Sequence, residues 1–157
     1  MWRRGLIVAA VVLFLDRLSK WWLISVFHMP EKLEVTLLPF FKLVMWWNRG
    51  VSFGVLNSHG EWQRWTFVVL FSIICLLLVR WMTKTDRVIT LTGLGLVLGG
   101  AIGNISDRVI YGAVADFFYF HIGDWYFPAF NVADMGISVG AAVLLYDAVT
   151  DRRPPAN

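Results

Sequence analysis

Four long apolar blocks constrain this chain more than any other feature of its sequence. They cover about 5–27, 65–82, 88–111 and 130–149, and each is close to the roughly twenty residues that an α-helix needs to cross a bilayer. Hydrophobic residues make up 58% of the chain and charged residues 16%, against about a quarter charged in soluble domains. The blocks predict an all-α integral membrane protein, with four transmembrane helices in a single membrane domain, 1–157.

The first block differs from the others because charged residues interrupt it. Asp16, Arg17 and Lys20 lie between an apolar run that ends at Leu15 and a second one that begins at Trp21. A cleaved signal peptide is the alternative for this block. Internal charges and three further apolar blocks favour a retained membrane helix instead.

The basic residues predict how the four helices are oriented. Four spans place both termini on one side of the membrane, and the Lys and Arg residues near the span ends gather on that side: Arg3, Arg4, Arg80, Lys84, Arg87, Arg152 and Arg153. Positive residues accumulate in cytoplasmic segments. We therefore expect cytoplasmic termini and two outer segments, 28–64 and 112–129. The net charge of +3 is too modest and too dispersed to indicate nucleic-acid binding.

The first outer segment has the pattern of short strands. Its two candidate runs, 33–38 and 40–47, are separated by Pro39. Its many aromatic side chains favour a position at the membrane surface, where amphipathic rings are enriched. We expect a small β-rich cradle there, between the first two helices and in contact with phospholipid.

Small residues recur every fourth position in the last two blocks. Gly95, Gly99 and Gly103 have this spacing in one block, and Gly136 and Gly140 have it in the other. Such faces let helices approach closely within lipid. We interpret them as packing surfaces.

Ionisable and amide residues inside the blocks need a physical reason, because a charge at the bilayer centre costs about 3 kcal/mol or more. Asp16 and Lys20 are four residues apart and predict an ion pair on one helical face. Asn104, Asp107 and Arg108 form a polar stripe in the third block. Asn131 and Asp134 form a second stripe at the same membrane depth. The two stripes predict a polar site near the outer ends of these helices.

The residue types in this region favour an aspartic mechanism. No Gly-x-Ser-x-Gly or His-Glu-x-x-His motif occurs, the histidines lack metal-ligand spacing, and the single cysteine lies in an apolar run. Asp116 and Asp134 remain as a carboxylate pair that could activate water, with no metal or cofactor. Taken singly, Asp116 is equally explained as a turn residue and Asp134 as a helix cap.

Two neighbouring carboxyls cannot both ionise cheaply, so we expect the pair to share one proton. The start of the fourth block offers the positive end of a helix dipole. Our hypothesis is that Asp134 is the ionised base and Asp116 the protonated acid.

Five short boxes in order along the chain resemble the bacterial lipoprotein signal peptidases, also called signal peptidase II. Arg17 stands where that family more often has glutamine, which leaves the role of Arg17 open. The boxes are Asp16-Arg17-Leu18-Ser19-Lys20, Asn48-Arg49-Gly50-Val51-Ser52-Phe53, Gly103-Asn104-Ile105-Ser106-Asp107-Arg108, Val114-Ala115-Asp116-Phe117 and Asn131-Val132-Ala133-Asp134.

The resemblance implies an enzyme that cuts diacylglyceryl-modified prolipoproteins directly before the lipidated cysteine, with Asp116 and Asp134 as the catalytic pair. It implies that a second group shapes the pocket around the substrate: Asn48, Gly50, Phe53, Asn104, Arg108 and Asn131. A third group would support that pocket: Asp16, Lys20, Gly103 and Asp107. The expected setting is a monomer in the bacterial inner membrane, with its site near the outer face.

A function from another class fits the same residues. Buried acids also relay protons in small proton-coupled transporters and channel subunits. Four spans leave little room for one chain to transport alone, and we keep this alternative beside the peptidase.

Overall fold

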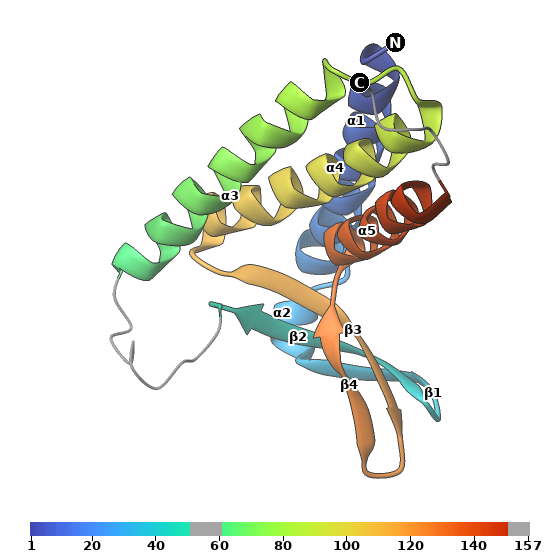
Figure 1. Ribbon diagram of the computed structural model, residues 1–157. Coiled ribbons are helices and arrows are strands. Elements are labelled where there is room, and N and C mark those ends of the chain that lie inside the picture. Colours follow the sequence, from blue (N-terminus) through green and yellow to red (C-terminus); the bar gives the residue numbers. More distant parts are fainter. Residues whose placement is uncertain (51–60, 151–157) are drawn as a thin grey trace.

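The computed structural model describes residues 1–50 and 61–150, which form a helical bundle with an antiparallel sheet at one end (Figure 1). The helices are α1 (Arg3–Trp21), α2 (Met29–Lys32), α3 (Glu61–Met82), α4 (Val88–Tyr111) and α5 (Val132–Thr150). A π-helix, η1 (Trp22–Val26), continues α1 without a break. The strands are β1 (Glu34–Leu38), β2 (Phe41–Asn48), β3 (Val114–Ile122) and β4 (Trp125–Phe130).

Three helices within the described ranges are long and apolar enough to cross a membrane, namely α3, α4 and α5. The remaining predicted span, 5–27, corresponds to α1 and η1, which do not meet the same criterion. Asp16, Arg17 and Lys20 lower the hydropathy of this helix. The protein is therefore mostly helical with three membrane-span candidates, and the predicted count of four is not confirmed.

α4 lies at the centre of the bundle and packs against α1, α3 and α5 (Figure 1). Glycines on α4 and α5 allow this close packing. A Cβ atom added at Gly99 would lie 2.5 Å from the backbone oxygen of Ala9 on α1. One added at Gly140 on α5 would lie 2.7 Å from the backbone oxygen of Gly93 on α4. The prediction that the glycine stripes are packing surfaces is confirmed at these crossings.

The sheet is a four-stranded antiparallel meander in the order β1-β2-β3-β4. β1 and β2 confirm the strands predicted at 33–38 and 40–47. The sequence placed the β-rich cradle only between the first two helices. That prediction was incomplete, because β3 and β4 belong to the second outer segment, 112–129. Gly123 and Asp124 form the two-residue turn between them, a pattern typical of hairpins.

A small apolar core joins the sheet to the end of the first helix. Leu23 from η1 and Met29 from α2 pack with Leu43, Ala115 and Phe117 from the sheet. Met29, Ala115 and Phe117 are fully buried. This core fixes β3 relative to the helices.

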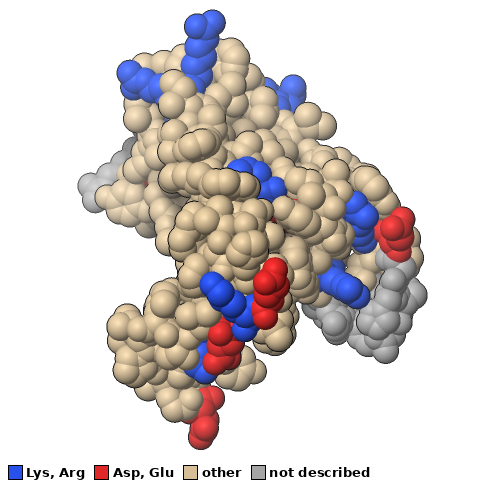
Figure 2. Space-filling view, turned by 180° about the vertical axis from the view of Figure 1, so that it is seen from behind, with Lys and Arg blue, Asp and Glu red and all other residues tan. Residues whose placement is uncertain are grey.

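The outer surface of the bundle is largely uncharged. Figure 2 shows a mostly tan surface over the helices, with some Lys and Arg side chains at the end away from the sheet and others in the middle and lower part, where Asp and Glu side chains also lie. Phe14, Leu76 and Leu145 are exposed on this surface, each by more than 60%. Large apolar side chains in such numbers are typical of a lipid-facing surface.

Candidate active site

Asp116 lies in β3 at the junction between the sheet and the bundle, and is only 2% exposed. Ala115 and Phe117 on either side belong to the apolar core, so Asp116 points to the opposite face of the strand. It pairs with Trp46 of β2, next to a β-bulge between Leu43 and Trp46. Bulges reorient neighbouring side chains, and this one lies beside the acid. Asp116 is therefore a strand residue, and the alternative of a turn residue is wrong.

Asp134 lies in the first turn of α5, three residues after Asn131. The backbone N–H of Asp134 donates to Oδ1 of Asn131 over 2.9 Å, and the backbone N–H of Asn131 donates to Oδ2 of Asp134 over 3.2 Å. These bonds satisfy two free donors at the helix start. Asp134 thus has the helix-capping geometry that the sequence allowed, and it also borders the polar site.

Asn131 brings the two acids together. Its side-chain Nδ2 donates to Oδ1 of Asp116 over 2.7 Å, and it is fully buried. Asn104 of α4 donates through Nδ2 to Oδ1 of Asp134 over 2.8 Å. The acids from β3 and α5 therefore share one hydrogen-bonded cluster, as the two polar stripes predicted.

The end of β2 closes another side of the cluster. Asn48 donates through Nδ2 to Oδ2 of Asp116 over 3.1 Å, and its Oδ1 accepts the backbone N–H of Gly50 over 2.9 Å. Gly50 has a φ of +110°, a conformation that side chains disfavour. Phe53, which the sequence assigned to the same site, lies outside the described residues.

Arg108 contributes positive charge from α4. Its Nη1 donates to the backbone oxygen of Asn104 over 3.1 Å. Its guanidinium lies 5.4 Å from the ring centroid of Phe67 and 5.3 Å from that of Phe71, both on α3. Aromatic faces stabilise a cation at these distances. The sequence did not predict that α3 contributes to the site.

A buried ionic network lies directly beneath the cluster. Lys20 of α1 is 2.9 Å from Asp16 and 2.7 Å from Asp107 of α4, measured from Nζ to Oδ2 in both pairs. All three side chains are at most 1% exposed. The predicted ion pair between Asp16 and Lys20 is confirmed, while its extension to Asp107 was not predicted. Gly103 leaves room for Asp16, since an added Cβ would lie 2.6 Å from its Oδ2.

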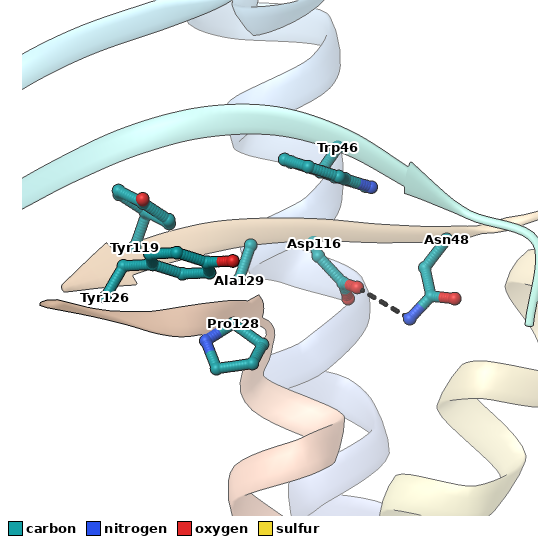
Figure 3. Close-up of a pocket in the computed structure, with 7 residues that line it drawn as sticks. All are labelled: Trp46, Asn48, Asp116, Tyr119, Tyr126, Pro128 and Ala129. Carbon is teal, nitrogen blue, oxygen red and sulfur yellow. Dashed lines mark hydrogen bonds between the residues drawn. The ribbon is translucent and has the colours of Figure 1, made fainter. Parts of the chain in front are cut away.

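A pocket of about 310 Å³ opens between β2 and the β3–β4 hairpin, beside Asp116 (Figure 3). Asp116 and Asn48 point toward each other at one side of it, and aromatic side chains surround the rest. Its lining consists of Trp46, Asn48, Asp116, Tyr119, Tyr126, Pro128 and Ala129. Tyr119, Tyr126, Pro128 and Ala129 were not identified from the sequence. The Gly-Asp turn was the signal that could have indicated the hairpin carrying them.

The surroundings of Asp116 favour its protonated form. Burial, and to a smaller extent the negative charge of Asp134, raise the pKa of Asp116 from 3.8 to about 7. Hydrogen bonds from Asn48 and Asn131, and the charge of Lys20, act in the opposite direction. Near neutral pH the Asp116 carboxyl can therefore hold or release a proton, as a general acid must.

Several acids close together could also suggest a metal centre. In 1–50 and 61–150, no three His, Cys, Asp or Glu side chains are arranged to hold a metal ion. Asp16 and Asp107 pair with a lysine, and Asp116 and Asp134 accept hydrogen bonds from asparagine amides. The cluster thus has the composition of an acid pair held by amide groups.

Comparison with known proteins gives concordant matches. The model of the family described as signal peptidase (SPase) II matches residues 8–150. A lipoprotein signal peptidase of Methylobacterium sp. (strain 4-46) is 43% identical over 92% of this chain and 88% of its own length. One from Burkholderia ambifaria (strain MC40-6) is 44% identical over 89% of this chain and 84% of its own length.

Two solved structures share the fold. A bacterial membrane enzyme solved by the in meso method at 1.9 Å resolution is 25% identical, with a TM-score of 0.80 over 94% of this chain and 93% of its own. A second one, solved by the same method at 2.3 Å, has a TM-score of 0.75 at 24% identity, over 98% of this chain and 94% of its own. The helical bundle with its terminal sheet is thus the architecture of a known membrane enzyme.

Proposed function

This chain belongs to the signal peptidase II family, and we propose that it cleaves diacylglyceryl-modified prolipoproteins by an aspartic mechanism, directly before the lipidated cysteine. The relatives reported above are named lipoprotein signal peptidases, which supports a protease acting on lipoprotein precursors. The aspartic chemistry rests on the acid cluster of this chain.

One observation carries the catalytic assignment: Asn131 hydrogen-bonds to both Asp116 and Asp134, at the edge of an open pocket. Acids held close together share a proton, so one carboxyl can act as acid while the other acts as base. We infer that Asp116 and Asp134 are this pair.

In the proposed reaction, ionised Asp134 accepts a proton from water as the water attacks the scissile carbonyl. Protonated Asp116 donates a hydrogen bond to the carbonyl oxygen. The raised pKa of Asp116 supports this division of roles. Because the acids interact, their titration belongs to the pair. Asp134 then passes the proton it took from water to the leaving nitrogen as the C–N bond breaks, which restores ionised Asp134 beside protonated Asp116.

We further propose that groups around the acids bind the substrate. Asn48, Gly50, Phe53, Asn104, Arg108 and Asn131 would contact or position the peptide near the scissile bond. The exposed indoles of Trp46 and Trp47 support contact with lipid on the outer side of the site. Binding the lipid chains away from the reacting bond would orient the peptide.

The proposed topology has α1 and η1 as a fourth span, with cytoplasmic termini. Asp16 and Lys20 face α4 and neutralise each other, which lowers the cost of placing them in a membrane. Arg3, Arg4 and Arg80 are exposed at the end away from the sheet, which supports a cytoplasmic position for that end. Both acids come from one chain, so a monomer suffices for the reaction.

Cleavage by purified protein in detergent tests this proposal. The substrate is a diacylglyceryl-modified prolipoprotein, and the unmodified precursor is the control for the lipid requirement. We expect cleavage before the modified cysteine, and a loss of at least about a thousandfold in Asp116→Asn and Asp134→Asn. Asp124→Asn, in the exposed hairpin turn, is the matched control and should cleave normally. Normal cleavage by either site variant would contradict the aspartic pair.

The same assay separates the peptidase from the proton-coupled transporter. A transporter requires two sealed compartments, whereas a peptidase acts in detergent. None of the relatives reported above favours transport. Absence of cleavage by folded, unaltered protein would bring the transporter back into consideration.

A further inference from the structure

Two buried acids hold the backbone immediately before each proposed catalytic residue. Oδ2 of Asp107 accepts the backbone N–H of Ala115 over 3.2 Å, just before Asp116. Oδ1 of Asp16 accepts the backbone N–H of Ala133 over 3.0 Å, just before Asp134. The ionic network beneath the site therefore reaches both catalytic segments through their main chains.

Two cations hold these acids. Lys20 contacts Oδ2 of both acids and is 1% exposed. Arg17 donates from Nη2 to Oδ1 of Asp107, and its Nε lies 3.7 Å from Oδ2 of Asp16. The Arg17 side chain is 28% exposed, at the edge of the network. The four side chains together carry two positive and two negative charges.

Arg17 contributes the second positive charge that the two buried carboxylates need and that Lys20 cannot supply alone. A single ammonium group facing two buried carboxylates would leave one negative charge without compensation, which is costly at low dielectric. Oδ2 of Asp107 already accepts from Lys20 and from Ala115, so Arg17 occupies the other oxygen. With both oxygens bound, the carboxylate plane of Asp107 is fixed, and with it the N–H of Ala115.

We propose that Arg17 is a positioning residue for the cleavage reaction, acting through Asp107 on the β3 segment that carries Asp116. This inference rests on the proposed function, because it concerns the placement of a proposed catalytic acid. Among the described residues, Arg17 contacts Asp16 and Asp107 and neither Asp116 nor Asp134. It is expected to affect the rate of the chemical step more than the binding of substrate.

A matched pair of variants tests this role. Arg87 at the opposite end of α4 also pairs with a buried acid, Asp147, over 2.6 Å, and it is 26% exposed, close to the value for Arg17. Arg17→Met and Arg87→Met thus remove equivalent surface-edge cations, and every hydrogen-bond donor of the side chain, from two buried carboxylates. Only the first touches the network beneath the site.

We expect Arg17→Met to lower kcat on the order of tenfold to a hundredfold, because small displacements of reacting groups are costly. KM should stay within about twofold, since uniform substrate binding is retained. Arg87→Met should keep kcat within about twofold after correction for the folded fraction. Amide hydrogen exchange adds a direct measurement: the Ala115 N–H should exchange faster in Arg17→Met and be unchanged in Arg87→Met.

Arg17→Lys keeps the positive charge and covers the case in which Arg17→Met fails to fold. It should have a kcat between those of the methionine variant and the unaltered protein. Unchanged kcat in folded Arg17→Met, or equal losses in both methionine variants, would overturn the positioning role. Misfolding of both Arg17 variants would also overturn it, because Arg17 would then serve folding alone. In each case cleavage by the unaltered protein shows that the proposed function itself holds.

Discussion

Asn131 and Asp134 cap the first turn of α5 reciprocally, each accepting the backbone N–H of the other through a side-chain oxygen. The cap orients the Asp134 carboxylate at the helix start and leaves the amide nitrogen of Asn131 free to bind Asp116. One asparagine therefore determines how the α5 acid is placed relative to the β3 acid. The Asn131 side chain thus makes both a local helix cap and a long-range contact with β3.

The two roles of Asn131 can be separated by substitution. Asn131→Ser keeps a good capping oxygen but is too short to reach Asp116, whereas Asn131→Ala loses both interactions. We expect Asn131→Ala to lose about 1 kcal/mol of stability and Asn131→Ser to stay near the unaltered protein. Both should cleave substrate at least about tenfold more slowly. Thermal unfolding in detergent and the cleavage assay measure the two effects, and full activity in Asn131→Ser would contradict the contact with Asp116.

The raised pKa of Asp116 predicts a pH-dependent change in stability. The folded protein prefers the neutral carboxyl, so this contribution is fully present below the unfolded pKa of 3.8 and is lost as pH rises through about 7. Asp116→Asn cannot ionise and escapes that loss. The Tm of Asp116→Asn relative to the unaltered protein should therefore increase from about pH 5 to about pH 8.

The exposed Asp124→Asn variant is the control for this measurement, and its relative Tm should stay constant across the same range. If the Tm difference between Asp116→Asn and the unaltered protein is also constant, the Asp116 carboxyl has an ordinary pKa in the folded protein.

Gly103 is predicted to tolerate no side chain. A Cβ there would lie 2.6 Å from Oδ2 of Asp16, and that carboxylate cannot easily move because Lys20 and the Ala133 N–H hold it. Gly103→Ala should cost about 1–3 kcal/mol of stability and reduce kcat. Ala142→Val adds bulk at an exposed position of α5 and should change neither. Unaltered kcat in Gly103→Ala would show that the Asp16 network can shift without disturbing the site.

The aromatic pair on α3 is predicted to hold Arg108 in place. Phe67→Leu removes one of the two rings facing the guanidinium, an interaction of about 0.5–2 kcal/mol. If Arg108 binds the substrate, KM should rise roughly twofold to tenfold. Phe14→Leu, on the exposed face of α1, is the matched control and should leave KM unchanged. An unchanged KM in Phe67→Leu would show that the ring is dispensable for the position of Arg108.

The helices were predicted well because their signals are local. The predicted range 88–111 agrees with α4, Val88–Tyr111. This helix begins directly after Arg87 and is followed by Gly112 in the left-handed conformation. Gly112 has a φ of +79°, which favours glycine at a helix end. α1 was also found where predicted, but its charges separate it from the three clearly apolar helices.

The sheet was predicted in part because strand pairing is not local. β1 and β2 were recognised from their apolar runs, whereas β3 and β4 were described only as an outer segment. Pairing of β2 with β3 brings Trp46 opposite Asp116, although α3 and α4 lie between them in the chain. The aromatic pocket beside Asp116 depends on that pairing, so Tyr119 and Tyr126 could not be assigned to it in advance.

The sequence by itself determined the membrane class and the long helices, and it offered a candidate acid pair in Asp116 of an outer segment and Asp134 of the last apolar block, because composition and spacing act over short distances. Only the tertiary structure decided which partners the buried acids have, including Asp16 and Asp107. The Ala133 N–H bonds to Asp16 from 117 residues away, and Lys20 joins Asp16 to Asp107. Such contacts depend on how closely α1, α4 and α5 pack, and the geometry of that packing is settled by all three helices together.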